Sequence, residues 1–193
     1  MHALLGLAAD DVPGYRKACR RLLEESGPNP SPDTALWLAW ACVLVPDAGV
    51  DPARLVQLAE RAAVVAPKNR DALLVRGAAL YRGGRWQEAL GPLTATVAAP
   101  QGPRAPAQGV GRSSPEAFDD TGYDLLFLAM AHQRLGHAEE ARRWLARGVR
   151  WMEQAPLPKT EQGGDNPLYG WNRRLAHEAL RREAEALVQG TKR

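Results

Sequence analysis

Apolar residues recur at every third or fourth position along most of the chain, the spacing that places them on one face of an α-helix. Residues 15–25 are typical, because Ala18, Cys19, Leu22 and Leu23 share one face and basic side chains occupy the other. Residues 32–45 are apolar on nearly all sides, so we expect that helix to lie between neighbours. The same spacing predicts further helices over residues 52–65, 71–82, 86–98, 118–135, 138–154 and 167–189.

Capping residues and glycines indicate where these helices begin and end. Ser31-Pro32 and Asp51-Pro52 each pair a side-chain oxygen that can accept a hydrogen bond from the first turn with a proline suited to the first helical position. Residues 99–114 and 155–166 are instead rich in Pro and Gly, so we expect an exposed insertion and a linker there. On the last helix, the expected buried face consists of Leu168, Trp171, Leu175, Ala179 and Leu187.

A repeat links the two central helix pairs. Residues 73–93 and 125–145 align without a gap and are identical at eight of 21 positions. The two windows are offset by 52 residues, which equals one unit of roughly 34 residues plus an insertion of about 18. A repeated helix–turn–helix unit predicts a solenoid, an architecture used mainly for binding.

Small residues recur where paired helices would cross closely, and larger apolar residues recur between the layers. The third unit carries Gly77, Gly84, Ala89 and Leu93 at these positions. The fourth unit carries Ala129, Gly136, Ala141 and Leu145 at the matching positions. The first unit fits the same frame with Gly6, Tyr15, Ala18 and Leu22, and the second matches only at Ala62 and Pro67.

With these residues, the chain resembles the tetratricopeptide-repeat regions of large bacterial proteins that also carry serine/threonine kinase or WD40 domains. The resemblance implies an all-α, right-handed superhelix of about four helix-turn-helix pairs plus a C-terminal capping helix. Its units would span about 1–30, 31–69, 70–98 and 118–154, with an insertion over 99–117, a linker over 155–166 and the capping helix over 167–189. An array of helical hairpins without true repeats is the alternative.

In such arrays the first helix of each unit lines a concave groove. The resemblance therefore nominates partner-binding residues in three units: Trp37, Trp40, Leu74, Tyr81, Arg82, Tyr123, Leu126, Met130 and Arg134. An apolar, aromatic groove suits an extended peptide or an amphipathic helix. Taken singly, Trp37, Trp40, Phe127 and Met130 fit an interhelical core better than a groove, and the groove rests on their combined placement. The lack of inner Lys and Asn residues argues against a clamp for a terminal carboxylate.

Composition and charge narrow the function further. The net charge of +3 is too small to indicate a nucleic-acid partner, and the arginines at 142–150 and 173–182 alternate with glutamates, which is typical of a solvated helix face with i,i+4 ion pairs. Neither a signal peptide nor a membrane-spanning run is evident, and two buried cysteines suit a reducing compartment, so we expect a cytoplasmic protein.

Motifs for chemistry are scarce. The four histidines lack metal-ligand spacing, and Gly83-Gly84 is a turn rather than a phosphate loop. We therefore expect a non-catalytic scaffold without metal or cofactor that binds a protein or peptide. A regulatory or self-association module of a kinase-linked signalling protein is the alternative, and an enzyme of another type stays open without residues to nominate.

Overall fold

The computed structural model describes residues 11–98, 121–154 and 167–190. Within these ranges every regular element is a helix, which confirms the predicted all-α class. The helices are α2 (Val12–Ser26), α3 (Pro32–Val43), α4 (Pro52–Val65), α5 (Arg70–Arg82), α6 (Trp86–Ala98), α7 (Thr121–Arg134), α8 (Ala138–Gln154) and α9 (Pro167–Gln189). The beginning of the first expected unit, the insertion at 99–117 and the linker at 155–166 lie outside the described residues.

Local chemistry sets the helix boundaries. The Ser31 side chain accepts a hydrogen bond from the Thr34 N–H, and the Asp51 carboxylate accepts one from the Ala53 N–H, each ahead of a proline in the first turn. Gly84 and Gly136 take positive φ angles of 74° and 81° in the two tight turns between paired helices, a conformation that costs glycine least. These starts and turns confirm the boundaries expected from the sequence.

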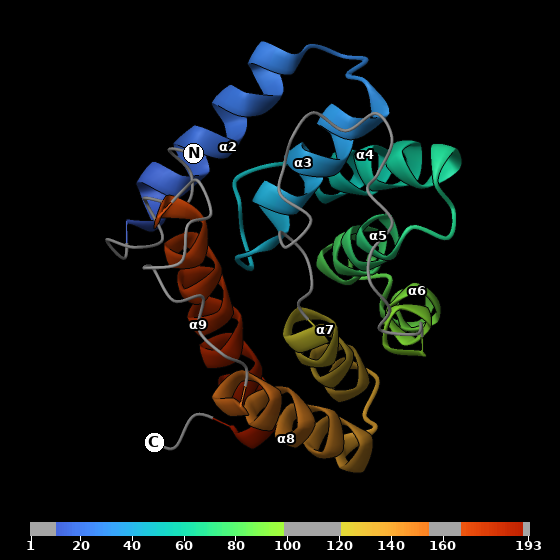
Figure 1. The fold of residues 1–193 in the computed structure, drawn as a ribbon, viewed down its shortest axis with the longest axis vertical. Helices are drawn as coiled ribbons and strands as arrows, with labels where there is room; N and C mark the ends of the chain where they lie inside the picture. The colour runs from blue at the N-terminus through green and yellow to red at the C-terminus, as the bar shows by residue number, and fades with distance from the viewer. Residues whose placement is uncertain (1–10, 99–120, 155–166, 191–193) are drawn as a thin grey trace.

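The helices are arranged in two rows. The pairs α3–α4, α5–α6 and α7–α8 pack most closely, while α3 contacts α5, α5 contacts α7, and α7 contacts α9. The helices α3, α5 and α7 thus form an inner row, with α4, α6 and α8 on its outer side, and α9 packs against α7 and α8 at the end of the row (Figure 1). We call the side of the inner row that faces α9 the inner face.

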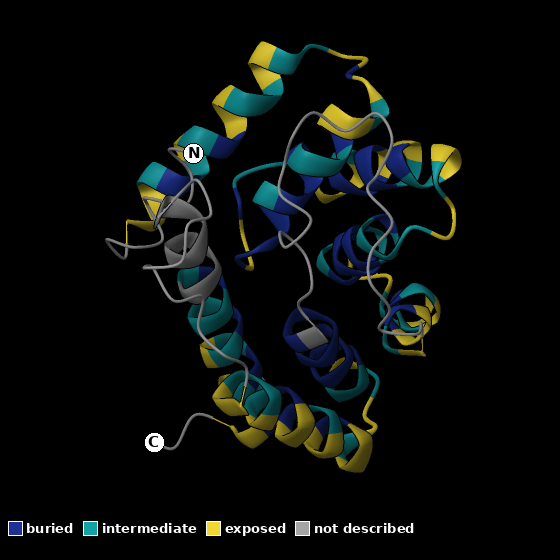
Figure 2. Cartoon of the chain, viewed as in Figure 1, coloured by how far each residue is buried: buried dark blue, intermediate teal, exposed yellow. Residues whose placement is uncertain are grey.

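The main core lies along the inner row, where α5 and α7 are dark blue over most of their length in Figure 2. One close approach depends on a missing side chain: a Cβ on Gly77 would lie 2.5 Å from Cγ of the fully buried Leu93 on α6. Glycine there lets α5 and α6 cross closely, and Leu93 fills the space between them, the roles that the repeat pattern predicts for small and large residues.

The buried face of α9 differs from the predicted one. Among the described side chains of α9, the buried ones are Ala176, Leu180, Ala184 and Val188, spaced four apart. Of the predicted face, Leu175 and Ala179 are only half-buried, Leu187 packs partly buried against the core, and Leu168 and Trp171 lie outside the described side chains. Alanine contributes little hydrophobicity to a pattern, but its small side chain allows a close helix contact, so packing selects the alanine stripe over the larger apolar residues. No described helix combines the length and apolar character needed to cross a membrane.

Candidate functional site

A buried ion pair joins the inner row to α9. Arg82, the last residue of α5, donates from Nη1 to Glu183 Oε1 (2.5 Å) and from Nη2 to Glu183 Oε2 (2.7 Å). Its Nε donates to the carbonyl of Val43 at the end of α3 (2.8 Å). The two charged side chains are 5% and 16% exposed, so water screens this bidentate pair little. We call the Arg82–Glu183 pair the latch.

Aromatic rings surround the latch. The Arg82 guanidinium lies 5.4 Å from the ring centroids of both Tyr81 and Phe127, within cation–π range. Tyr81 and Phe127 themselves meet edge to face, with centroids 5.7 Å apart. Burial and the negative charge of Glu183 raise the pKa of Tyr81, so its hydroxyl stays protonated. The latch is therefore enclosed by α5 and α7 as well as by the end of α3.

A second contact on α9 uses His177. Its ring stacks on Tyr123 of α7 with centroids 4.1 Å apart, and Tyr123 meets Trp40 of α3 edge to face at 4.8 Å. Trp151 of α8 lies edge-on to His177 at 6.0 Å. One chain of aromatic contacts thus connects α3, α7, α9 and α8, about two helical turns along α9 from Glu183.

The structure buries most of the residues that the sequence nominates for partner binding. Trp40 and Tyr81 are 9% and 5% exposed, and Tyr123, Leu126, Leu74 and Met130 are buried as well. An open groove lined by these side chains was expected. The arrangement differs because α9 packs against α7 and reaches the end of α5 through the latch. Tyr123 therefore contacts Trp40 and His177, and Arg82 contacts Glu183, instead of solvent.

Two nominated residues lie elsewhere. Trp37 is half-buried at the border of the core. Arg134 is exposed at the end of α7, where its guanidinium lies 5.8 Å from the Trp86 ring at the start of α6. Arg134 and Arg82 occupy matching places in the repeat, but among the described residues only Arg82 of the two forms an ion pair with α9.

The other end of α5 carries a second buried ion pair. Arg70 Nη2 lies 2.5 Å from Oδ2 of Asp124, which is fully buried on α7, and Arg70 Nε donates to the carbonyl of Thr96 near the end of α6 (3.3 Å). Arg70 therefore joins the consecutive helices α5, α6 and α7, whereas Arg82 at the opposite end of α5 joins α5 to α3 and α9. Together they fix the tilt of α5 within the inner row.

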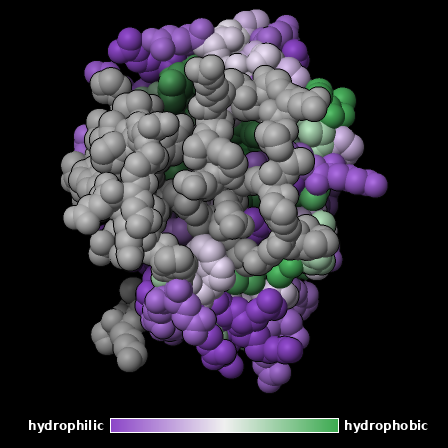
Figure 3. Space-filling view, in the orientation of Figure 1, coloured by the Kyte–Doolittle hydropathy of each residue, from purple (hydrophilic) through white to green (hydrophobic). Residues whose placement is uncertain are grey.

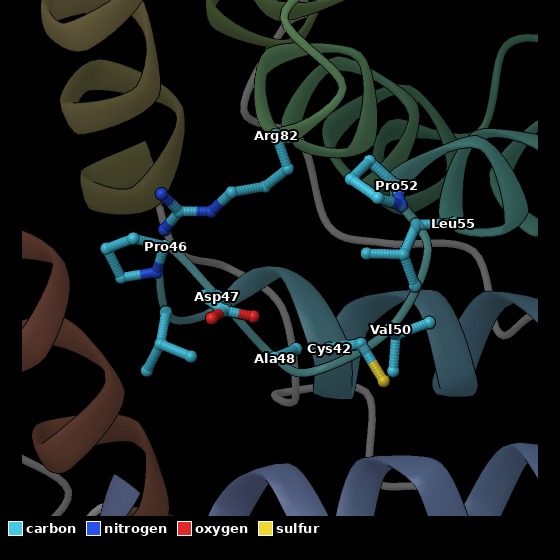
Figure 4. A pocket seen from close by; sticks show the side chains of 9 residues that line it. Cys42, Pro46, Asp47, Ala48, Val50, Pro52, Leu55 and Arg82 are labelled. Carbon is cyan, nitrogen blue, oxygen red and sulfur yellow. The ribbon is translucent and has the colours of Figure 1, made fainter.

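A cavity of about 210 Å³ lies beside the latch, between the end of α3, the connection to α4 and the side chain of Arg82 (Figure 4). Cys42 and Leu55 supply part of its apolar wall. Its charged groups already have protein partners, since Arg82 binds Glu183 and Asp47 binds Arg16 at 2.7 Å. The cavity thus presents a mainly apolar space beside side chains that are already bound.

The two cysteines form a buried pair between α2 and α3. Cys19 and Cys42 are 0% and 1% exposed. Their mutual hydrogen bond, together with burial, raises the pKa of the Cys42 thiol, and the same hydrogen bond lowers the pKa of Cys19. The phenol of Tyr15 donates to the Ala41 carbonyl beside them, and burial raises its pKa well above the ordinary value. Buried, hydrogen-bonded thiols of this kind hold α2 to α3.

Comparisons with known proteins find no match. Neither a family model, nor a curated protein, nor a solved structure is similar to this chain. Among the described residues there is also no group of three or more His, Cys, Asp or Glu side chains placed to hold a metal ion. The residues around the latch form the candidate functional site.

Sequence reasoning missed the α9 side of this site. Glu183 and His177 lie on the helix that the sequence assigns to capping, among other charged residues. The only available signal is their spacing: six residues apart, both lie close to the alanine stripe of Ala176, Leu180 and Ala184. Small residues allow α9 to approach its neighbours closely, and a carboxylate beside them can then reach a buried arginine.

Proposed function

We propose that this chain is a non-catalytic protein-interaction module of the tetratricopeptide type, whose inner face binds an amphipathic helix bearing a carboxylate. The observation that carries the proposal is the latch, because here the inner face already holds such a helix, α9. The bidentate Arg82–Glu183 pair and the Tyr123–His177 stack supply charge and shape selection. Because α9 belongs to the same chain, its contacts with the inner face indicate which side chains a partner helix would need.

Two further observations support the repeat type. The matched windows at 73–93 and 125–145 fall on α5–α6 and α7–α8, and each inner helix contacts the next inner helix. Gly77 and Leu93 also meet where the pattern expects a small and a large residue. A helix that occupies the inner face is a familiar mode of recognition, with anchors at spacings of three and four residues.

The cis position of α9 favours a regulatory variant of this function. A partner must compete with α9, which is tethered and therefore present at a high effective concentration. Any change that weakens the latch would raise the fraction of open module and so the apparent affinity for a partner. The same competition allows α9 of one chain to bind the inner face of another, which is self-association.

The test uses the full chain and a labelled peptide with the sequence of residues 167–189. Glu183→Gln in the chain weakens α9 in cis but leaves the inner face intact, so the labelled wild-type peptide should bind at least about tenfold more tightly than it binds the wild-type chain. Fluorescence anisotropy measures the affinity, and light scattering reports any dimer that forms by exchange of α9.

The matched control is Glu185→Gln, since Glu185 pairs with Arg181 within α9 (2.8 Å) rather than with the inner row. This control should bind the peptide no better than the wild-type chain. Equal peptide binding by the two variants would show that α9 is not held by the latch, and the proposal would then fail.

A further inference from the structure

The outer face of α8, remote from the latch, carries a row of exposed arginines. Arg142, Arg143, Arg147 and Arg150 are all exposed, and we call them the arginine face. Positions 143, 147 and 150 follow the i, i+4, i+7 spacing, so they line up over about 10 Å of helix. Figure 3 shows hydrophilic residues gathered over α8 at the bottom of the view.

The arginine face lacks the ion pairs that its sequence predicts. Glu139 precedes Arg143 by four residues, the spacing at which helical ion pairs form, yet none of the four arginines pairs with an acid anywhere in the described part of the chain. Elsewhere i,i+4 pairs do form, as between Arg181 and Glu185 (2.8 Å). Four guanidinium groups on one face are therefore left without neutralising partners.

One of these groups is held in place. The Arg147 guanidinium lies 4.5 Å from the ring centroid of Trp144, a cation–π contact. Trp144 is half-buried and packs against the core, so it anchors Arg147 to the helix. The same contact covers one face of the indole, which is the surface that a nucleic-acid base would need for stacking.

The charge pattern along α8 selects among anionic partners. Glu139 and Glu140 precede the arginine face, and Glu153 follows it. A long polyanion that crosses the helix lengthwise would pass over these carboxylates and be repelled, whereas a short acidic segment meets only the arginines. A symmetric pairing of two α8 helices is disfavoured, because a twofold axis through the middle of the helix would set Arg147 against its own copy.

We propose that the arginine face binds a short acidic helix of another protein, with carboxylates at i, i+4 and i+7. The guanidinium groups of Arg143, Arg147 and Arg150 each donate two N–H groups to one carboxylate, a bidentate geometry for which arginine is better suited than lysine. This second surface is independent of the latch, so the module can hold a helix on its inner face and an acidic partner on its outer face.

The experiment measures binding of the full chain to a labelled helical peptide with glutamates at i, i+4 and i+7. A peptide of the same composition with its glutamates dispersed around the helix, and a single-stranded RNA of equal charge, are the competing ligands. The variant is Arg143→Gln, Arg147→Gln and Arg150→Gln in one chain. The matched control replaces Lys17, Arg20 and Arg61, three other exposed cations, by Gln and changes the net charge equally.

The arginine-face variant should lose at least about tenfold in affinity for the patterned peptide, and the control less than about threefold, because distant surface charges are screened. Circular dichroism should show both variants folded. The proposal is overturned if the wild-type chain does not bind the patterned peptide, if both variants lose affinity equally, or if the dispersed peptide or the RNA binds as tightly.

Discussion

Replacing Glu183 by Ala tests the energetic role of the latch. The change removes both carboxylate acceptors of Arg82, whose side chain is 5% exposed, and leaves its guanidinium with the Val43 carbonyl alone. Removal of one partner from a buried ion pair costs about 3–5 kcal/mol, because a buried charge is left uncompensated. Since Glu183 is 16% exposed and water can reach the vacated space, we expect a cost of about 3 kcal/mol.

Urea unfolding followed by far-UV circular dichroism measures this loss. For a chain of this size, about 3 kcal/mol corresponds to a fall in Tm of roughly 6–12 °C. Glu185→Ala on the same helix is the control, because the Arg181–Glu185 pair is half-exposed and should contribute about 0.3–0.5 kcal/mol.

A double variant distinguishes the cost of leaving the Arg82 charge unpaired from the cost of losing the contact between α5 and α9. Arg82→Met combined with Glu183→Leu replaces both charges by apolar groups, which should recover most of the stability lost in Glu183→Ala. The reasoning is refuted if Glu183→Ala costs less than about 1 kcal/mol, or if the double variant is no more stable than the single one.

Two further predictions concern packing and protonation. Gly77→Ala would bring a Cβ to 2.5 Å from Cγ of Leu93 and should lower stability by about 1–3 kcal/mol. Thermal unfolding checks this, and an unchanged Tm would contradict it. Burial and the charge of His137 lower the pKa of His132. Because the unfolded state then binds a proton more readily than the folded state, stability should fall as the pH decreases through about 6.5. Urea titrations at several pH values should show that His132→Gln flattens this dependence, and parallel pH profiles for the variant and the wild-type chain would count against it.

Most of the helical framework is predictable because it depends on local chemistry. The oxygens of Ser31 and Asp51 accept the hydrogen bonds of a first turn whatever surrounds them, and Gly84 and Gly136 are required by the backbone itself. The close approach at Gly77 is also predictable, since the repeat marks it as the small residue of a paired helix.

The site is less predictable because it depends on a contact between distant segments. Arg82 and Glu183 are 101 residues apart, and the spacing of neither residue along its helix indicates the other. The pattern correctly places Trp40 and Tyr123 on inner helices but cannot show that α9 covers them. The position of α9 depends on how its alanine stripe fits against neighbouring helices, and hydrophobicity alone predicts a different buried face for this helix.

The distance along the chain between the two halves of the latch also has a consequence for biosynthesis. Glu183 leaves the ribosome after Arg82 by 101 residues, about 5–20 s at ordinary rates of translation. During that interval the nascent chain presents the inner surfaces of α3 and α5, and later that of α7, before α9 has been synthesised. A holdase chaperone has this interval in which to bind the chain, and the arrival of α9 ends it.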